Sequence, residues 1–163
     1  MTEMPRPLAL DRIGALLFEQ KIEARPDELE PLARRMGVPA VHRLACSFRL
    51  RRVGASVIEA EGVLSAEVVQ VCVVSLDEFT QAVEDRFSLQ FVPEGAEAPD
   101  DDLEAPDQIT YDSSAIDLGE TAAQQLALAL DPYPHKPGAE EFPDEITGPA
   151  NPFAALAARR RTQ

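Results

Sequence analysis

The sequence has little of what marks a secreted or membrane protein. It contains two cysteines, too few for the disulfide framework of a small secreted domain. No apolar run approaches the roughly 18 residues that a membrane-spanning helix needs. Residues 1–5 lack the basic region and apolar stretch of a signal peptide. With 163 residues and a 45% apolar fraction, we expect a single globular domain in the cytoplasm, with no membrane partner.

Basic residues are scarce in the second part of the chain. Residues 1–56 carry ten Lys/Arg and seven Asp/Glu, whereas residues 57–163 carry five and twenty-two, which gives a net charge of −14. Because an acidic protein repels phosphates at long range, we expect no DNA partner. The acidic part favours a basic partner such as a ribosomal protein, although acidic segments more often serve solubility alone.

Proline is absent from residues 40–92, although the chain has fourteen prolines. Because central strands cannot spare a backbone N–H donor, this window predicts the main sheet. Residues 94–120 hold ten acidic residues and no basic one, and we expect a mobile acidic loop at about 94–107. We therefore expect one α+β domain over residues 6–135, followed by a proline-rich linker and C-terminal tail over 136–163.

Side chains within the proline-free window alternate with a period of two. Apolar residues occupy one face of two successive segments: Leu44, Cys46, Phe48 and Leu50, then Ile58, Ala60 and Leu64. This pattern predicts an antiparallel hairpin over residues 41–66 that turns near Gly54. Residues 68–74 are apolar at nearly every position, which predicts a central strand covered on both faces. Further strands are predicted over residues 86–91 and 18–24.

Two helices are predicted, near 26–36 and 118–130. The first has a proline in its first turn, apolar residues at i, i+3, i+4 and i+7, and a stop at Gly37. The second follows Asp117 as its N-cap, with Glu120 at the spacing of a capping box. Helices segregated from a mainly antiparallel sheet define the α+β class, with the sheet either open or curled towards a barrel.

Motifs of catalysis and metal binding are missing from the sequence. It has no G-x-S-x-G, no G-x-G-x-x-G and no Walker loop. His42 and Cys46 would share a strand face, but they would lie roughly 13 Å apart, too far for one zinc ion. We interpret Cys46 and Cys72 as small core residues, and His42 and His135 as ordinary histidines. We therefore expect no catalytic residue, no metal, no cofactor and no enzymatic activity.

Arginines gather on the polar side of the predicted hairpin. Arg43, Arg49 and Arg51 share one strand face, and Arg52 lies beside the turn. Because guanidinium groups fit phosphates bidentately, these four residues are candidate RNA contacts. The alternative, slightly favoured by the turn near Gly54, is that they pair with glutamates across the hairpin. These glutamates are Glu59, Glu61 and Glu67.

An ordered series of segments resembles a known family. The series includes Ile22–Ala24, Val71–Leu76, Phe87–Phe91, Ile116–Glu120, Leu126–Pro134 and Asn151–Leu156. Over most of its length, roughly from Ala15 to Arg160, the chain resembles the bacterial YceD-like family, described as large-subunit ribosomal RNA accumulation proteins. Many members have a Cys-x-x-Cys pair; here Cys72 matches the first position and Ser75 the second, and no metal is carried over. The resemblance implies a non-catalytic factor.

Resemblance and charge together give a functional hypothesis. The chain would promote accumulation or maturation of large-subunit ribosomal RNA by binding a ribosomal protein or a precursor of the subunit. Candidate contacts to the basic protein are the acidic residues Asp100, Asp101, Asp102 and Glu104. The alternative is an acidic binding module or chaperone for another basic protein, with no ribosomal role.

Overall fold

The fold is built on a five-stranded sheet. The computed structural model describes residues 2–96, 104–112 and 114–139. The elements in chain order are β1 (Pro7–Ala9), the 3-10 helix η1 (Leu10–Arg12), β2 (Phe18–Glu23), α1 (Pro26–Met36), β3 (Ala40–Val53), β4 (Val57–Val71), β5 (Glu78–Pro93), β6 (Gln108–Tyr111), β7 (Ala115–Asp117) and α2 (Leu118–Ala129). The large sheet has the order β2-β3-β4-β5-β6, antiparallel except between β5 and β6, and β1 pairs with β7 in a second sheet.

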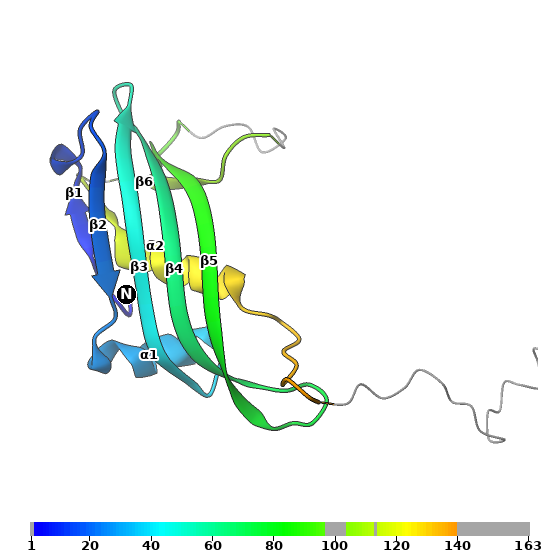
Figure 1. Cartoon of the computed structure of the whole chain (residues 1–163). Helices are drawn as coiled ribbons and strands as arrows, with labels where there is room; N and C mark the ends of the chain where they lie inside the picture. The colour runs from blue at the N-terminus through cyan, green and yellow to red at the C-terminus, as the bar shows by residue number, and fades with distance from the viewer. Residues whose placement is uncertain (1, 97–103, 113, 140–163) are drawn as a thin grey trace, which may run out of the picture.

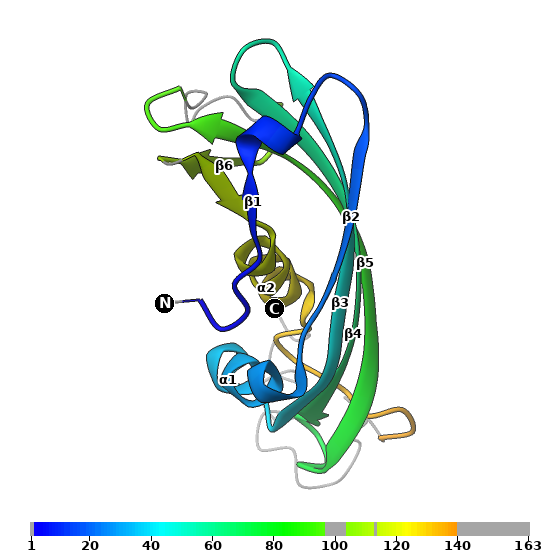
Figure 2. The ribbon, with the colours of Figure 1, turned by 90° about the vertical axis from the view of Figure 1, so that its left-hand side faces the viewer.

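All the other elements lie on one face of the large sheet. Figure 2 shows α1, α2 and β1 on the concave side of the curved sheet, while the opposite side carries no helix or strand of the described residues (compare Figure 1). We call the covered side the inner face and the bare side the outer face. The α+β class is confirmed, and the sheet is open because its edge strands β2 and β6 do not pair with each other.

The core lies between the inner face and the helices. The predicted alternation is confirmed, because the apolar residues of β3 and β4 are buried there: Leu44, Cys46, Phe48, Leu50, Ile58, Ala60 and Leu64. Phe87 packs its ring edge-on against Phe48 at 5.7 Å between ring centroids, above Gly62. A Cβ at Gly62 would lie 2.1 Å from this ring, so the contact requires glycine.

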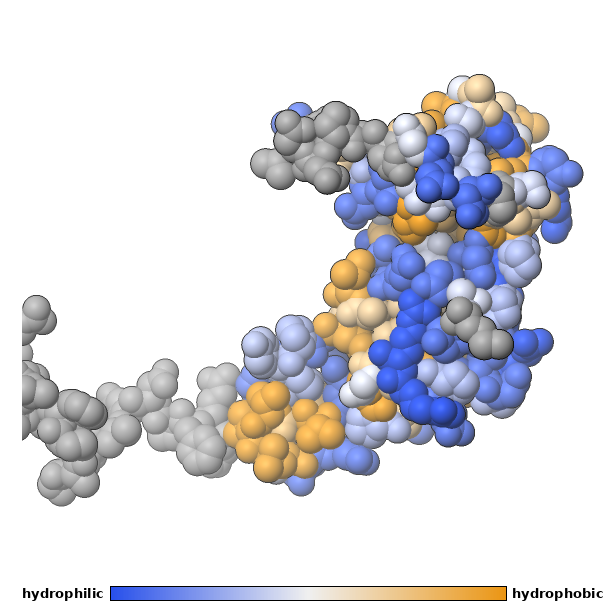
Figure 3. All heavy atoms as spheres, turned by 180° about the vertical axis from the view of Figure 1, so that it is seen from behind, coloured by the Kyte–Doolittle hydropathy of each residue, from blue (hydrophilic) through white to orange (hydrophobic). Residues whose placement is uncertain are grey.

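Residues 68–71 lie in β4, the middle strand of the sheet, as predicted, but the prediction that the segment is covered on both faces is wrong. The segment is the end of β4 and the start of its connection to β5, and no helix or strand of the described residues lies over its outer face. Val71 and Val73 are therefore 40% and 46% exposed. Seen from behind, apolar side chains gather at this end of the molecule (Figure 3).

Both predicted helices are present. α1 ends at Gly37, which adopts the left-handed conformation with φ of 67°. At the start of α2, the Asp117 carboxylate accepts hydrogen bonds from the backbone N–H groups of Gly119 and Glu120. The predicted return bond of a capping box is replaced, because the Glu120 carboxylate instead accepts two hydrogen bonds from the guanidinium of Arg35 in α1. The two helices are thereby tied together.

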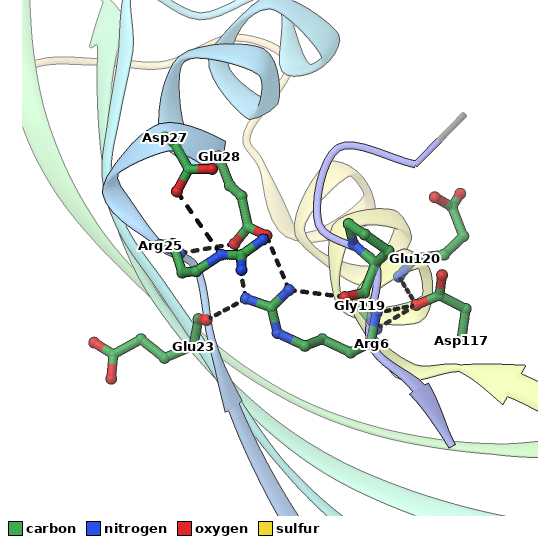
Figure 4. Close-up of polar contacts among 9 residues, drawn as sticks. Arg6, Glu23, Arg25, Asp27, Glu28, Asp117, Gly119 and Glu120 are labelled. Atoms are coloured by element: carbon green, nitrogen blue, oxygen red, sulfur yellow. Dashed lines mark hydrogen bonds and ion pairs between the residues drawn. The ribbon is translucent and has the colours of Figure 1, made fainter. Parts of the chain in front are cut away.

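The N-terminal segment forms a clasp that the sequence did not predict. Arg6 donates two hydrogen bonds to the Glu28 carboxylate, at 2.9 and 2.8 Å, and a third to the backbone carbonyl of Glu23 (Figure 4). Its backbone N–H reaches the Asp117 carboxylate at 2.9 Å. We call this contact between Arg6, Glu28 and Asp117 the N-terminal clasp. It joins the N-terminal segment to the start of both helices.

Candidate functional site

The outer face of the sheet carries the predicted arginines in rows of charged side chains. Strand register places Arg51 opposite Glu59 and Arg49 opposite both Glu19 and Glu61. Because successive side chains of a strand point to opposite faces, these residues all lie on the outer face. No helix or strand of the described residues lies over this face (Figure 2), and Arg43, Arg49 and Arg51 are exposed on it.

Ion pairs connect these arginines to neighbouring strands. Arg51 lies 2.6 Å from Glu59 across the β3–β4 hairpin, and Arg49 lies 3.6 and 3.7 Å from Glu19 and Glu61. The sequence alternative of pairing across the hairpin is thus confirmed for Arg49 and Arg51.

Arg43 forms its ion pair with a different strand. It is in register with Glu67, as the hairpin predicts, but its ion pair is with Glu23 of β2, at 3.4 Å. The position of β2 beside β3 explains this partner, because it offers a second row of carboxylates on the opposite side of β3.

These ion pairs are weak enough for the arginines to exchange their carboxylate partners for another anion. The side chains of Arg43, Arg49 and Arg51 are 53–55% exposed, and their carboxylate partners are also solvated. Ion pairs of this kind contribute only about 0–1 kcal/mol. A phosphate can therefore replace a carboxylate on such an arginine at little cost, and pairing does not remove these residues as contacts.

A groove of about 740 Å³ crosses the strands on this face. One wall is the row of Lys21, Ser47, Val63 and Arg86, and the other is the row of Glu19, Arg49, Glu61 and Ser88. The side chains of Ser47 and Val63, at the centre of the first wall, and of Ser88, at the β5 end of the second, are short and leave space in the groove. Its floor is the backbone between these rows, including Gly62.

Sequence reasoning missed two cations of this groove. Lys21 and Arg86 stand at opposite ends of one wall, three strand spacings apart, or about 14 Å. Neither forms an ion pair within the part of the chain that the structure describes. The alternation of side chains along β2 and β5 indicates that Lys21 and Arg86 point away from the core. That they line the same groove follows only from the order of the strands in the sheet, which the sequence does not show.

Arg52 has a different environment from the other three arginines. Its guanidinium donates hydrogen bonds to the backbone carbonyls of Ile13 at 3.0 Å, Ala55 at 3.2 Å, and Leu10. It thereby holds the segment after β1 against the end of β3. The sequence indicates this difference, because Arg52 is two residues from the inward-facing Leu50 and therefore lies on the same strand face as Leu50, opposite to Arg51.

The acidic candidates fall at the edge of the described structure. Asp100, Asp101 and Asp102 lie outside the described residues, whereas Glu104 is described and exposed before β6. Exposed carboxylates flank this stretch on the described side, including Glu94, Asp107 and Asp112. The acidic residues therefore extend beyond the predicted loop to both sides of β6.

The two cysteines occupy different environments. Cys46 is buried in the core, and burial raises the pKa of its thiol to about 12. Cys72 is buried as well, in the β4–β5 connection, where hydrogen bonds from the side chain and backbone N–H of Ser75 lower the pKa of its thiol to about 6. Within residues 2–96, 104–112 and 114–139, no three His, Cys, Asp or Glu side chains come together as metal ligands.

Comparison with known proteins identifies the family. The family model described as Large ribosomal RNA subunit accumulation protein YceD matches residues 60–158, which is more than half of the chain. No curated protein and no solved structure matches the chain. None of the helices in the described residues has the length and apolar character to cross a membrane. The chain belongs to the YceD family, whose description names RNA accumulation and no reaction.

Proposed function

We propose that this YceD family member promotes accumulation of large-subunit ribosomal RNA by binding a ribosomal protein or a precursor of the large subunit in the cytoplasm. The family match over residues 60–158 carries the ribosomal part of this proposal. The binding part is supported by the charge distribution and by the bare outer face. In this proposal the protein acts by association, without catalysis.

The acidic second part of the chain is proposed to contact a basic ribosomal protein. Residues 57–163 carry five basic against twenty-two acidic residues, and ten of the acidic ones lie within 94–120. Such a field attracts a basic partner and accelerates its association at low ionic strength. Asp100, Asp101, Asp102 and Glu104 are the proposed contacts within this region.

The outer face is proposed to approach RNA once the protein is on the subunit precursor. Arg43, Arg49 and Arg51 lie there in weak, solvated ion pairs, beside Lys21 and Arg86 of the groove. A net charge of −14 opposes RNA binding by the isolated chain, so a basic partner would act first. Arg52, also a predicted contact, would support this face by holding the end of β3.

Depletion in cells tests the ribosomal role. Removal of the protein is expected to lower large-subunit ribosomal RNA relative to small-subunit RNA, and re-expression to restore the ratio. On sucrose gradients, a fraction of the protein should sediment with large-subunit precursors. An unchanged RNA ratio, with the protein only in free fractions, would reject this role. Purification dominated by a non-ribosomal basic protein would instead support the chaperone alternative.

Charge reversal on the outer face tests the RNA contact. Arg49→Glu with Arg51→Glu is expected to weaken binding to large-subunit precursor particles, which carry the basic ribosomal proteins, by about tenfold or more, because each lost charge-assisted contact contributes about 1.5–3 kcal/mol. The dependence of affinity on salt should also decrease. Filter binding over a series of salt concentrations measures both.

The control for this double variant changes the net charge of the protein by the same amount. Arg34→Glu with Lys136→Glu also reverses two exposed cations, which each form one ion pair and lie on α1 and on the segment after α2 rather than on β3. Binding should fall much less in this control. Equal losses in the two double variants would show that only net charge matters, and unchanged binding in the first would reject the outer face as an RNA contact.

A further inference from the structure

A second pocket lies at the opposite end of the molecule from the acidic segment, where both helices end. It has a volume of about 450 Å³ and lies between the C-terminus of α1, the end of β4 and the segment after α2. Its apolar lining includes Met36, Val38, Val71, Val73, Leu130 and Pro134. The pocket therefore offers an apolar surface that the described residues leave unfilled.

A buried amide in the same pocket lacks a hydrogen-bond donor. Gln70 is 5% exposed and uses its Nε2 to donate to the backbone carbonyl of Asp131 at 3.2 Å. Its Oε1 is buried and has no partner among the described residues. Leaving a buried acceptor unpaired is costly, so this oxygen indicates that the pocket receives a donor as well as apolar groups.

Two exposed apolar side chains lie on the chain segments that form one side of this pocket. Leu76 and Tyr133 are 76% and 70% exposed, on the β4–β5 connection and on the segment after α2. Leu76 also adopts a φ of 60°, which non-glycine residues rarely do, and its backbone N–H donates to the Cys72 carbonyl. The apolar side chains at this end are visible in Figure 3. An apolar segment binding here would cover them.

The chain itself supplies a segment with the matching chemistry. Residues 151–158 contain the apolar Phe153 and Leu156, and three consecutive arginines follow at 159–161. Asp131 lines the pocket together with Arg35, whose charge is balanced by two glutamates of its own. The adjoining β4–β5 connection and the start of β5 add Asp77, which is paired with Lys136, and the exposed Glu78. An apolar segment with a basic end thus complements an apolar pocket with an acidic rim.

The chain also leads from this pocket to that segment. Pro134 lines the pocket, and Lys136 forms an ion pair with Asp77 at 3.7 Å, three residues before the described structure ends at Ala139. Residues 140–150 separate Ala139 from the segment and can span at most about 36–40 Å, ample to return to the pocket. A covalent link of this length gives the segment a high effective concentration there.

We propose that residues 151–161 bind in this pocket, with Phe153 and Leu156 against the valines and prolines and a backbone N–H donating to Gln70 Oε1. Arg159, Arg160 and Arg161 then lie along the acidic rim. A partner that uses this end of the molecule must first displace the segment. This inference does not rest on the proposed ribosomal function, because it concerns the isolated chain.

A single tryptophan reports on the contact, since the chain has none. In full-length Phe153→Trp, we expect tryptophan emission at shorter wavelength than in a solvent-exposed peptide, and protection from iodide quenching. Adding Val73→Glu should shift the emission to the solvent value and remove the protection. The matched control is Val53→Glu, because Val53 has similar exposure, 40% against 46%, at the far end of the sheet.

Solvent-like emission in Phe153→Trp alone would overturn the proposal, as would an equal shift with Val53→Glu. Emission that depends on protein concentration would assign the pocket to a second copy and would also overturn it. If Val73→Glu unfolds the chain, Phe153→Ser with Leu156→Ser provides a second test. Backbone NMR signals of Gln70 and Val73 should then change; unchanged signals would contradict binding in the pocket.

Discussion

Glu28→Gln is expected to lower the free energy of unfolding by about 1.5–3 kcal/mol, as measured by urea denaturation at neutral pH. Glu28 is 3% exposed and accepts hydrogen bonds from Arg6 at 2.9 and 2.8 Å, and from the side chain and backbone N–H of Arg25 at 2.8 and 2.7 Å. The variant loses the charge-assisted strength of these hydrogen bonds to a buried carboxylate, whereas the arginines left behind stay 22% and 63% exposed and can be solvated.

The pH dependence of stability provides a second measurement on the same group. Hydrogen bonds from Arg6, and then from Arg25, lower the pKa of Glu28 from 4.5 to about 2. A carboxylate with a lowered folded-state pKa contributes stability that is fully present above pH 4.5 and is lost as the pH falls through 2. At about 1.36 kcal/mol per pKa unit, this contribution is about 3 kcal/mol. In Glu28→Gln, unfolding free energy should therefore depend less on pH between 4.5 and 2.

Glu30→Gln is the matched control on the same helix. Glu30 forms an ion pair with Arg34 one helical turn away, but its side chain is 82% exposed. Such a pair contributes about 0.3–0.5 kcal/mol, so the variant should keep nearly the stability of the unmodified chain. Similar losses in Glu28→Gln and Glu30→Gln would show that the N-terminal clasp contributes little.

The sequence predicted the elements whose signals are local. Alternation in β3 and β4 and the stop at Gly37 each depend on a few residues, and the absence of proline depends on composition alone; the structure confirms the strands and the helix end that they predicted. The N-terminal clasp was not predictable, because Arg6 and Glu28 are separated by 22 residues and meet only after α1 packs on the sheet. The strand ending at Val71 was misjudged because apolar composition alone does not show which face is covered.

The same distinction applies to the outer face. Parity along the strand placed Arg49 and Arg51 together, and the turn near Gly54 correctly brought Glu59 and Glu61 opposite them. The groove was not predictable, since it depends on β2 and β5 flanking the hairpin. That order is set by packing between distant parts of the chain.

Gly119→Ala is expected to destabilise the protein by at least about 3 kcal/mol, although helix propensity alone favours alanine by about 1 kcal/mol. A Cβ at position 119 would lie 1.6 Å from the backbone carbonyl oxygen of Met4. Because this obstacle is backbone, the N-terminal segment must move away from α2. Met4 and Leu8, which are 1% and 3% exposed, then lose burial worth about 1.5–3 kcal/mol each. Urea denaturation measures the change.

Gly14→Ala provides the matched control, because a Cβ there would meet nothing within 4 Å and the residue is not among the glycines with positive φ. We expect it to be neutral or to stabilise by up to about 1 kcal/mol. Gly119→Ala and Glu28→Gln should also be non-additive, since both release the N-terminal segment that Arg6 anchors. The double variant should therefore lose less than the sum of the two single losses. Full additivity would mean that the close approach at Gly119 and the ion pair at Glu28 stabilise the fold independently.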